Sequence, residues 1–145
     1  MKRCLFAALL VLPLLGSGSP REYDDRTKLN ELVGVWEVVK AENCGFEMAG
    51  GGSDAIIFDT THVTYKLGSQ VLIAGTYKTT ASCGGLAVLD EVFVEKHGQL
   101  ITWHNIYQVD GDVLRIAYVM PNGSERPLDF QDKQHLFIYT LKRVK

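Results

Sequence analysis

From Leu32 onward, hydrophobic and polar residues alternate with a period of two, and β-branched and aromatic residues are frequent. Gly, Asp, Asn and Ser interrupt this pattern at short intervals, and no long 3.6-residue period appears. The pattern predicts eight strands, at residues 33–41, 54–59, 62–67, 70–79, 86–95, 99–109, 112–120 and 134–144. Mostly short links join them. We therefore expect an all-β, antiparallel up-and-down barrel, because closure removes the exposed edges of a sheet.

Two-residue hairpin signals occur at Gly68-Ser69 and at Asp110-Gly111. The second signal pairs Val109 with Asp112 and so predicts a register for the two strands around it. The pairs on the more aromatic face, which we assign to the barrel interior, are Tyr107–Leu114, Asn105–Ile116, Trp103–Tyr118 and Ile101–Met120. The opposite face carries Ile106, Arg115, His104 and Ala117 and is predicted to lie outside.

The predicted interior supplies the candidate ligand-binding residues, which are Trp103, Asn105, Tyr107, Tyr118, Phe137 and Tyr139. Asn105 has two interpretations at this point. A buried amide can be bonded to a neighbour or to trapped water, or it can anchor the polar group of a ligand. An eight-stranded barrel can likewise hold one small ligand or be filled by its own side chains.

Gly34-Val35-Trp36 opens the first strand and resembles the Gly-x-Trp signature at the start of a lipocalin barrel. The resemblance implies that Trp36 plugs one end of the barrel and that a late basic residue lies across it. Arg143 shares a face with Phe137, Tyr139 and Leu141 on the last strand. Strand parity brings that strand's end to the start of the first strand. A cation–π contact between Arg143 and Trp36 would contribute about 0.5–2 kcal/mol.

Over residues 30–143 the chain also resembles the uncharacterised lipocalin-like domain family named for planctomycetes. The matching pieces are Leu32-Val33-Gly34-Val35-Trp36, Ile57-Phe58-Asp59, Gly75-Thr76-Tyr77, the run from Ile106 to Leu114, Arg126-Pro127-Leu128-Asp129-Phe130 and Leu141-Lys142-Arg143. The chain departs from the family pattern in its Cys pair and its Gly-rich first loop. The resemblance implies the barrel fold and supplies no activity.

The N-terminus reads as a secretory signal peptide over residues 1–19, with Lys2 and Arg3 ahead of an apolar run from Cys4 to Leu15. That run is shorter than the roughly 20 residues that span a bilayer. We expect a polar leader at 20–31, a barrel domain at 32–145, and a secreted or periplasmic monomer without stable membrane insertion. Removing Lys2 and Arg3 leaves a net charge of about −4, which argues against a nucleic-acid partner.

Cys44 and Cys83 remain after cleavage, and either a disulfide or two separate thiols is open. A bridge would contribute about 4 kcal/mol in the chain-entropy model. Strand parity opposes it, since Cys44 follows the first strand and Cys83 the fourth, which places them at opposite ends of the barrel. Disulfide geometry requires Cα atoms within about 7 Å.

Catalytic and metal-binding patterns are not visible in the sequence. The four His residues, at 62, 97, 104 and 135, lack metal-ligand spacing, and the neighbours Asp90 and Glu91 should face opposite sides of a strand. No metal or other cofactor is expected, and an enzyme is the weakest of three hypotheses. The leading one is a small-molecule binding module for an apolar or amphipathic ligand. The alternative is a protein-interaction or inhibitor module with a filled barrel, acting through the leader around Arg21–Arg26.

Overall fold

The computed structural model describes residues 31–49, 52–81, 86–95, 97–119, 125–132 and 134–145. The predicted signal peptide at 1–19, the predicted leader up to residue 30, Cys83 and Met120 lie outside the described residues. The strands are β1 (Gly34–Asn43), β2 (Phe46–Glu47), β3 (Ala55–Phe58), β4 (His62–Leu67), β5 (Gln70–Ala81), β6 (Ala87–Val94), β7 (Leu100–Asp110), β8 (Val113–Val119) and β9 (Leu136–Arg143).

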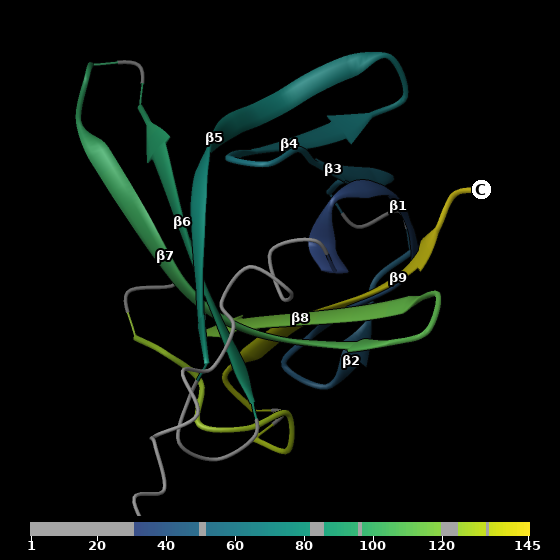
Figure 1. Ribbon diagram of the computed structural model, residues 1–145. Coiled ribbons are helices and arrows are strands. Elements are labelled where there is room, and N and C mark those ends of the chain that lie inside the picture. The colour runs from purple at the N-terminus through teal and green to yellow at the C-terminus, as the bar shows by residue number, and fades with distance from the viewer. Residues whose placement is uncertain (1–30, 50–51, 82–85, 96, 120–124, 133) are drawn as a thin grey trace, which may run out of the picture.

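Each strand from β4 to β9 pairs antiparallel with the strand before it, and β1 pairs with both β3 and β9. The sheet is therefore closed, and β1 and β9 lie side by side where it closes (Figure 1). The prediction of an all-β, eight-stranded, antiparallel up-and-down barrel is confirmed, and the barrel is consistent with a lipocalin-like type. The ninth strand, β2, is a two-residue addition that pairs with the end of β1, and it is too short to produce a recognisable period.

The predicted register of the β7–β8 hairpin is wrong by two residues. The structure pairs Asp110 with Val113 and Tyr107 with Ile116, so the two-residue loop is Gly111-Asp112. Gly111 takes the positive φ of the turn, at 58°, which glycine adopts without steric cost. A shift of two residues preserves the side-chain alternation, so the faces are as predicted although the partners differ.

The main core fills the barrel with buried side chains from every strand except β2. A second cluster lies outside the barrel, where Ile106, Ala117 and Ile138 on β7, β8 and β9 pack with Leu136 and Phe130. Segment 125–132 contributes Phe130, so it covers part of the outer face of these strands. Ile106 and Ala117 lie on the outer face, as predicted, but their burial there, at 2% and 0% exposure, was not predicted.

One end of the barrel is closed by Leu32, Trp36 and Arg143, and we call it the closed end. Trp36 is fully buried and its Nε1 donates a hydrogen bond of 2.7 Å to the Leu32 carbonyl oxygen. The Arg143 guanidinium lies 4.1 Å from the centroid of the Trp36 ring, which confirms the predicted cation–π contact. Its nitrogens also donate to the carbonyl oxygens of Val33 and Glu31, at 2.7 and 2.6 Å.

Gly34 explains why the closed end requires a glycine two residues before Trp36. Its φ is +142°, and a Cβ at this position would lie 2.8 Å from Nη1 of Arg143. Only glycine tolerates that backbone conformation readily. The Gly-x-Trp pattern therefore has a local cause, since the glycine makes room for the arginine that covers the tryptophan.

Candidate functional site

Six aromatic side chains form a continuous ring of contacts in the half of the barrel opposite the closed end. Around this ring, the contacts run in the order Tyr65, Phe93, Trp103, Tyr118, Phe137, Tyr139 and back to Tyr65, with centroid separations of 4.7 to 6.4 Å. We call these residues the aromatic ring, and the end of the barrel that holds them the aromatic end. Separations of this size are typical of interacting aromatic pairs.

The aromatic ring follows from side-chain alternation on neighbouring strands. Phe137 and Tyr139 are two residues apart on β9 and point to the same face, and Tyr118 is the cross-strand partner of Phe137. Tyr118 stacks on Phe137 at 5.1 Å and on Trp103 at 5.5 Å. Since Trp103 and Tyr118 remain partly exposed whereas the other four are buried, they form the accessible side of the ring.

Phe93 has its place in the ring because its cross-strand partner on β5 is Gly75. A Cβ on Gly75 would lie 2.6 Å from Cδ1 of Phe93 and 2.1 Å from the carbonyl oxygen of Val92. Any larger residue would push β5 and β6 apart. The glycine therefore allows the Phe93 ring to lie flat against the neighbouring strand.

A fully buried carboxyl group, that of Glu91, lies beside the aromatic ring. The Tyr65 hydroxyl donates to it at 2.9 Å from both carboxyl oxygens, and Nδ2 of Asn105 donates to Oε2 at 2.8 Å. No Lys or Arg among the described residues pairs with it. Burial raises the pKa of Glu91 to about 7, against the opposing effect of the hydrogen bonds from Tyr65 and Asn105.

The tyrosines around Glu91 stay neutral at ordinary pH. Burial raises the pKa of Tyr65, and the Glu91 charge raises it further. Burial also raises the pKa of Tyr118 and that of Tyr139, although a hydrogen bond shared with Ser53 opposes the rise at Tyr139. Glu91 is therefore the group at this site that changes charge near neutral pH.

Asn105 is fully buried and points inward, as its predicted face required. Its amide nitrogen is bonded to Glu91, but Oδ1 has no hydrogen-bond partner among the described residues. The same holds for Oδ1 of Asn43, which faces the interior from β1, paired with Phe137. Buried acceptors without donors cost free energy, so these atoms favour a donor that the described side chains do not supply.

Five of the six predicted ligand-binding residues meet at this site, four of them in the aromatic ring and Asn105 beside it. Tyr107 lies deeper, paired with Ala87 and Ile116, and is not a member of the ring. Sequence reasoning missed Tyr65, Phe93 and Glu91. Side-chain alternation predicted that Asp90 and Glu91 face opposite sides of their strand, which places one of the two inside the barrel. A register for β6 and β7, which pairs Glu91 with Trp103, would have identified Glu91.

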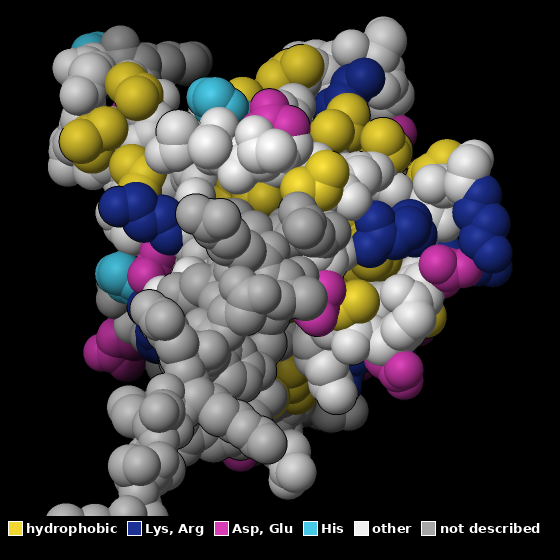
Figure 2. Space-filling view, viewed as in Figure 1, with side chains coloured by type: hydrophobic (Ala, Val, Ile, Leu, Met, Phe, Trp, Pro, Cys, Tyr) yellow, Lys and Arg dark blue, Asp and Glu magenta, His cyan; other side chains and the backbone are white. Residues whose placement is uncertain are grey.

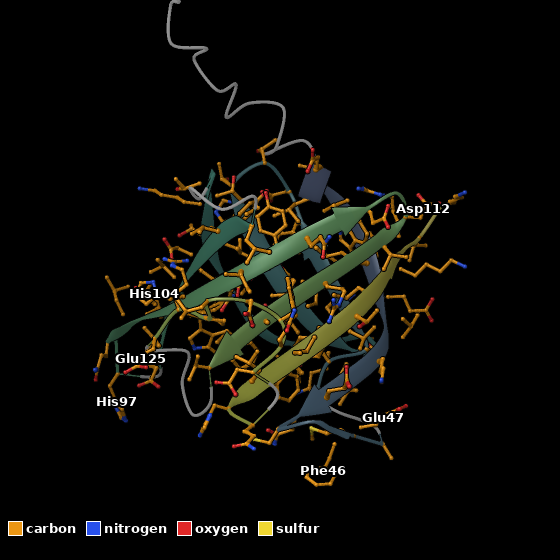
Figure 3. The ribbon with its side chains drawn as sticks, turned by 90° about the horizontal axis from the view of Figure 1, so that it is seen from below. Phe46, Glu47, His97, His104, Asp112 and Glu125 are labelled. Atoms are coloured by element: carbon orange, nitrogen blue, oxygen red, sulfur yellow. The ribbon has the colours of Figure 1, made fainter. Side chains whose placement is uncertain are left out.

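Asp90, on the outer face, belongs to a separate polar cluster with His104 and Arg126. Oδ1 of Asp90 is 2.8 Å from Nδ1 of His104 and 2.6 Å from Nη2 of Arg126, while Nη1 of Arg126 donates to the Asn105 carbonyl oxygen. Partial burial alone would raise the pKa of Asp90, but the hydrogen bonds and charges of His104 and Arg126 outweigh it and lower this pKa. Figure 3 shows His104 and Glu125, the neighbour of Arg126, on the same side of the barrel. The cluster fixes segment 125–132 to β6 and β7, and it holds His104 on the outer face, where the sequence placed it.

Cys44 lies on the exposed turn between β1 and β2 with a φ of +51°, and it has no disulfide partner among the described residues. A shallow groove of about 210 Å³ runs nearby between β1 and residues 47–48 and 52–54, with Met48 and Leu67 in its lining. Ligand pockets usually measure 300 Å³ or more, so this groove is smaller than a usual ligand site. The Cys44–Cys83 bridge stays an open prediction, since Cys83 lies outside the described residues.

Among the residues that the structure describes, no three His, Cys, Asp or Glu side chains gather closely enough to hold a metal ion. Within the same ranges, no helix has the length and apolar character needed to cross a bilayer. Comparison of the chain with models of protein families, with curated proteins and with solved structures finds no match.

Proposed function

We propose that this protein is an exported, lipocalin-like binding module that holds one small amphipathic molecule at the aromatic end of its barrel. The observation that carries the proposal is that the ring of six aromatic side chains lies beside a buried, ionisable carboxyl group and an amide oxygen without a partner among the described residues. Ligand sites typically combine apolar and aromatic walls with a few placed polar groups. A barrel that served only as a scaffold would be more stable with an apolar side chain in place of Glu91.

The surroundings of the aromatic end also favour an amphipathic ligand. Val94 and Leu100, which flank the β6–β7 turn, are 64% and 66% exposed. Figure 2 shows hydrophobic side chains gathered over the tip of this hairpin. Leu67 and Phe46 are exposed at the same end, and Figure 3 places Phe46 and His97 away from Asp112, which marks the opposite end. Apolar surface near the entrance would attract a ligand that has an apolar body.

Native mass spectrometry tests the proposed function directly. The full-length gene would be expressed in secreting cells, and the protein would be purified from the medium or periplasm without detergent. We expect a bound mass of a few hundred daltons that is released on denaturation. A bare protein mass, together with no binding of added apolar or amphipathic probes, would contradict the proposal and favour the filled barrel.

The same spectrum tests export and the pairing of the cysteines. Export predicts that the denatured mass lacks residues 1–19, whereas a retained N-terminus would contradict the signal peptide. A Cys44–Cys83 disulfide would lower the mass by about 2 Da relative to two thiols. Membership of the lipocalin-like family stays part of this proposal.

A second candidate function is capture of a protein partner through the hairpin that β1 and β2 form. Phe46 is 78% exposed there, beside Met48 and the shallow groove, and aromatic residues are enriched at interaction hot spots. Replacing Phe46 by Ser, and separately deleting residues 20–28, would test this role. Loss of a co-purifying protein in either variant would support it, and unchanged recovery in both would count against it.

A further inference from the structure

We propose that the ligand of the aromatic end is an organic cation, a protonated amine or quaternary ammonium compound, with the Glu91 carboxylate as its counter-ion and the aromatic ring around its charge. The inference rests on the proposed function and specifies its ligand class. It is carried by three features of the described residues, which are the charge of the buried group, the hydrogen-bonding character of the interior and the arrangement of the aromatic faces.

The charge of the buried group comes first. Glu91 is fully buried, and its two hydrogen bonds come from the neutral groups of Tyr65 and Asn105. A buried carboxylate normally has a cationic partner. None of the described Lys and Arg side chains provides one, so a bound cation would complete the ion pair that the chain leaves unfinished.

The hydrogen-bonding character of the interior points the same way. Nδ2 of Asn105 and the Tyr65 hydroxyl already donate to Glu91. The atoms without partners among the described residues include Oδ1 of Asn105 and Oδ1 of Asn43, and both are acceptors. A ligand that supplies N–H donors or a positive charge fits these acceptors, whereas a carboxylate or phosphate group would be repelled by them and by Glu91.

The aromatic faces provide the third feature. The ring centroid of Trp103 lies 4.7 Å from that of Phe93, 5.5 Å from that of Tyr118 and 6.0 Å from that of Tyr65. Trp103 is also the cross-strand partner of Glu91. Aromatic faces attract cations electrostatically, and aromatic cages are a known means of holding quaternary ammonium groups. Trp103 and Tyr118 are partly exposed, so they are the members of the aromatic ring that a ligand arriving from solvent would contact.

A matched pair of probes tests the inference on the mature, secreted chain. Choline carries a trimethylammonium group, and 3,3-dimethylbutan-1-ol has the same shape with carbon in place of the charged nitrogen. Binding would be followed by NMR titration at pH 8, where Glu91 is ionised. We expect choline to bind roughly 30-fold more tightly than the neutral alcohol.

Two variants separate Glu91 from charge in general. Glu91→Gln keeps the size of the side chain and its acceptor for Tyr65, and we expect it to weaken choline binding by at least about 30-fold. The matched control is Glu37→Gln, because Glu37 is exposed on β1 and neighbours Trp36 of the closed end. Choline affinity in that variant should equal that of the wild type.

The pH dependence gives an independent readout, because the charge of choline does not change with pH. The titratable groups that face Glu91 are the phenols of Tyr65, Tyr77, Tyr118 and Tyr139, on β4, β5, β8 and β9, and burial raises the pKa of each. They stay neutral between pH 5.5 and 8. Choline affinity should rise roughly 30-fold over this range as Glu91 ionises, and it should be flat in Glu91→Gln.

The outcomes distinguish this inference from the proposed function. Equal or tighter binding of the neutral alcohol, or unchanged choline affinity in Glu91→Gln, would overturn the cation while leaving a ligand-binding barrel. A neutral or anionic molecule found bound by native mass spectrometry, with no choline binding, would do the same. If neither probe binds and the native mass is bare, both the inference and the proposed function are wrong.

Discussion

The two ends of the barrel use aromatic residues and charge in different ways. At the closed end, Arg143 covers Trp36, and its guanidinium nitrogens donate to two backbone carbonyl oxygens. At the aromatic end, Glu91 is buried without a cation, and an amide oxygen beside it lacks a donor among the described residues. The closed end is thus built for stability, whereas the aromatic end gives up stability, a pattern expected of functional sites.

The largest expected effect comes from removing the tryptophan of the closed end. Trp36→Ala should lower the free energy of unfolding by about 4 kcal/mol, because the side chain is fully buried. Trp103→Ala should cost only about 2 kcal/mol, since Trp103 is partly exposed. Urea denaturation of both variants makes the measurement. Equal losses, or a larger loss at Trp103, would contradict the division between the two ends.

The second effect concerns the pH dependence of stability. Glu91 has a pKa of about 7 in the folded protein and 4.5 as its ordinary value. The stability that the fold gains from binding this proton more tightly is therefore fully present below pH 4.5. Between these values the unfolded chain releases the proton while the folded protein keeps it. The free energy of unfolding therefore falls by about 3 kcal/mol as the pH rises to 7, and it changes no further above that.

Glu91→Gln removes this pH-dependent loss of stability and is the matched comparison. The difference in unfolding free energy between the variant and the wild type should grow in favour of the variant from pH 4.5 to 7. Asp59, Asp90 and Asp112 have lowered pKa values, and their effects at lower pH cancel in that difference. A constant difference across the range would show that Glu91 does not titrate there.

The third effect returns to the closed end. Gly34→Ala should destabilise the protein by about 2 kcal/mol, because a Cβ meets Arg143 and the backbone at φ +142° disfavours any side chain. Gly68→Ala is the control, since Gly68 has a positive φ of 58° with nothing within 4 Å of the added Cβ. Thermal unfolding should show the smaller loss for Gly68→Ala, and a reversed order would refute the role given to Gly34.

The smallest effect lies on the outer face. Arg126→Met removes the contacts of Arg126 with Asp90 and with the Asn105 carbonyl oxygen, which should cost about 1 kcal/mol at this partly exposed site. Hydrogen exchange should increase in segment 125–132 and on the strands beneath it. Unchanged protection there would mean that the apolar contact of Phe130 alone holds the segment.

Alternation of side chains made most of the fold predictable. The eight strands and the inward face of β7 follow from period-two patterns. The contact of Arg143 with Trp36 was implied by the resemblance to the lipocalin signature and supported by strand parity. The β7–β8 register was not predictable from its turn residues, because Asp110-Gly111 and Gly111-Asp112 both suit a two-residue loop. The burial of Ile106 and Ala117 depends on segment 125–132, whose position only tertiary packing determines.

The candidate site was half predictable for a related reason. Trp103, Tyr118, Phe137 and Tyr139 share inward faces on strands adjacent in sequence, so the pattern groups them. Tyr65 reaches the site from β4, which is not a neighbour of β7, β8 or β9 in the sheet. Glu91 was hidden by its chemistry, because an acidic residue normally argues for the solvent face of a strand.

The chain contains only two tryptophans, one at each end of the barrel, and they allow the most direct test of this division. In Trp36→Phe, the fluorescence of Trp103 should change with a midpoint near pH 7 as its cross-strand partner Glu91 ionises, and adding Glu91→Gln should abolish the change. In Trp103→Phe, the fluorescence of Trp36 should stay constant over the same range. A silent Trp103, or a transition that survives Glu91→Gln, would contradict the account of the aromatic end.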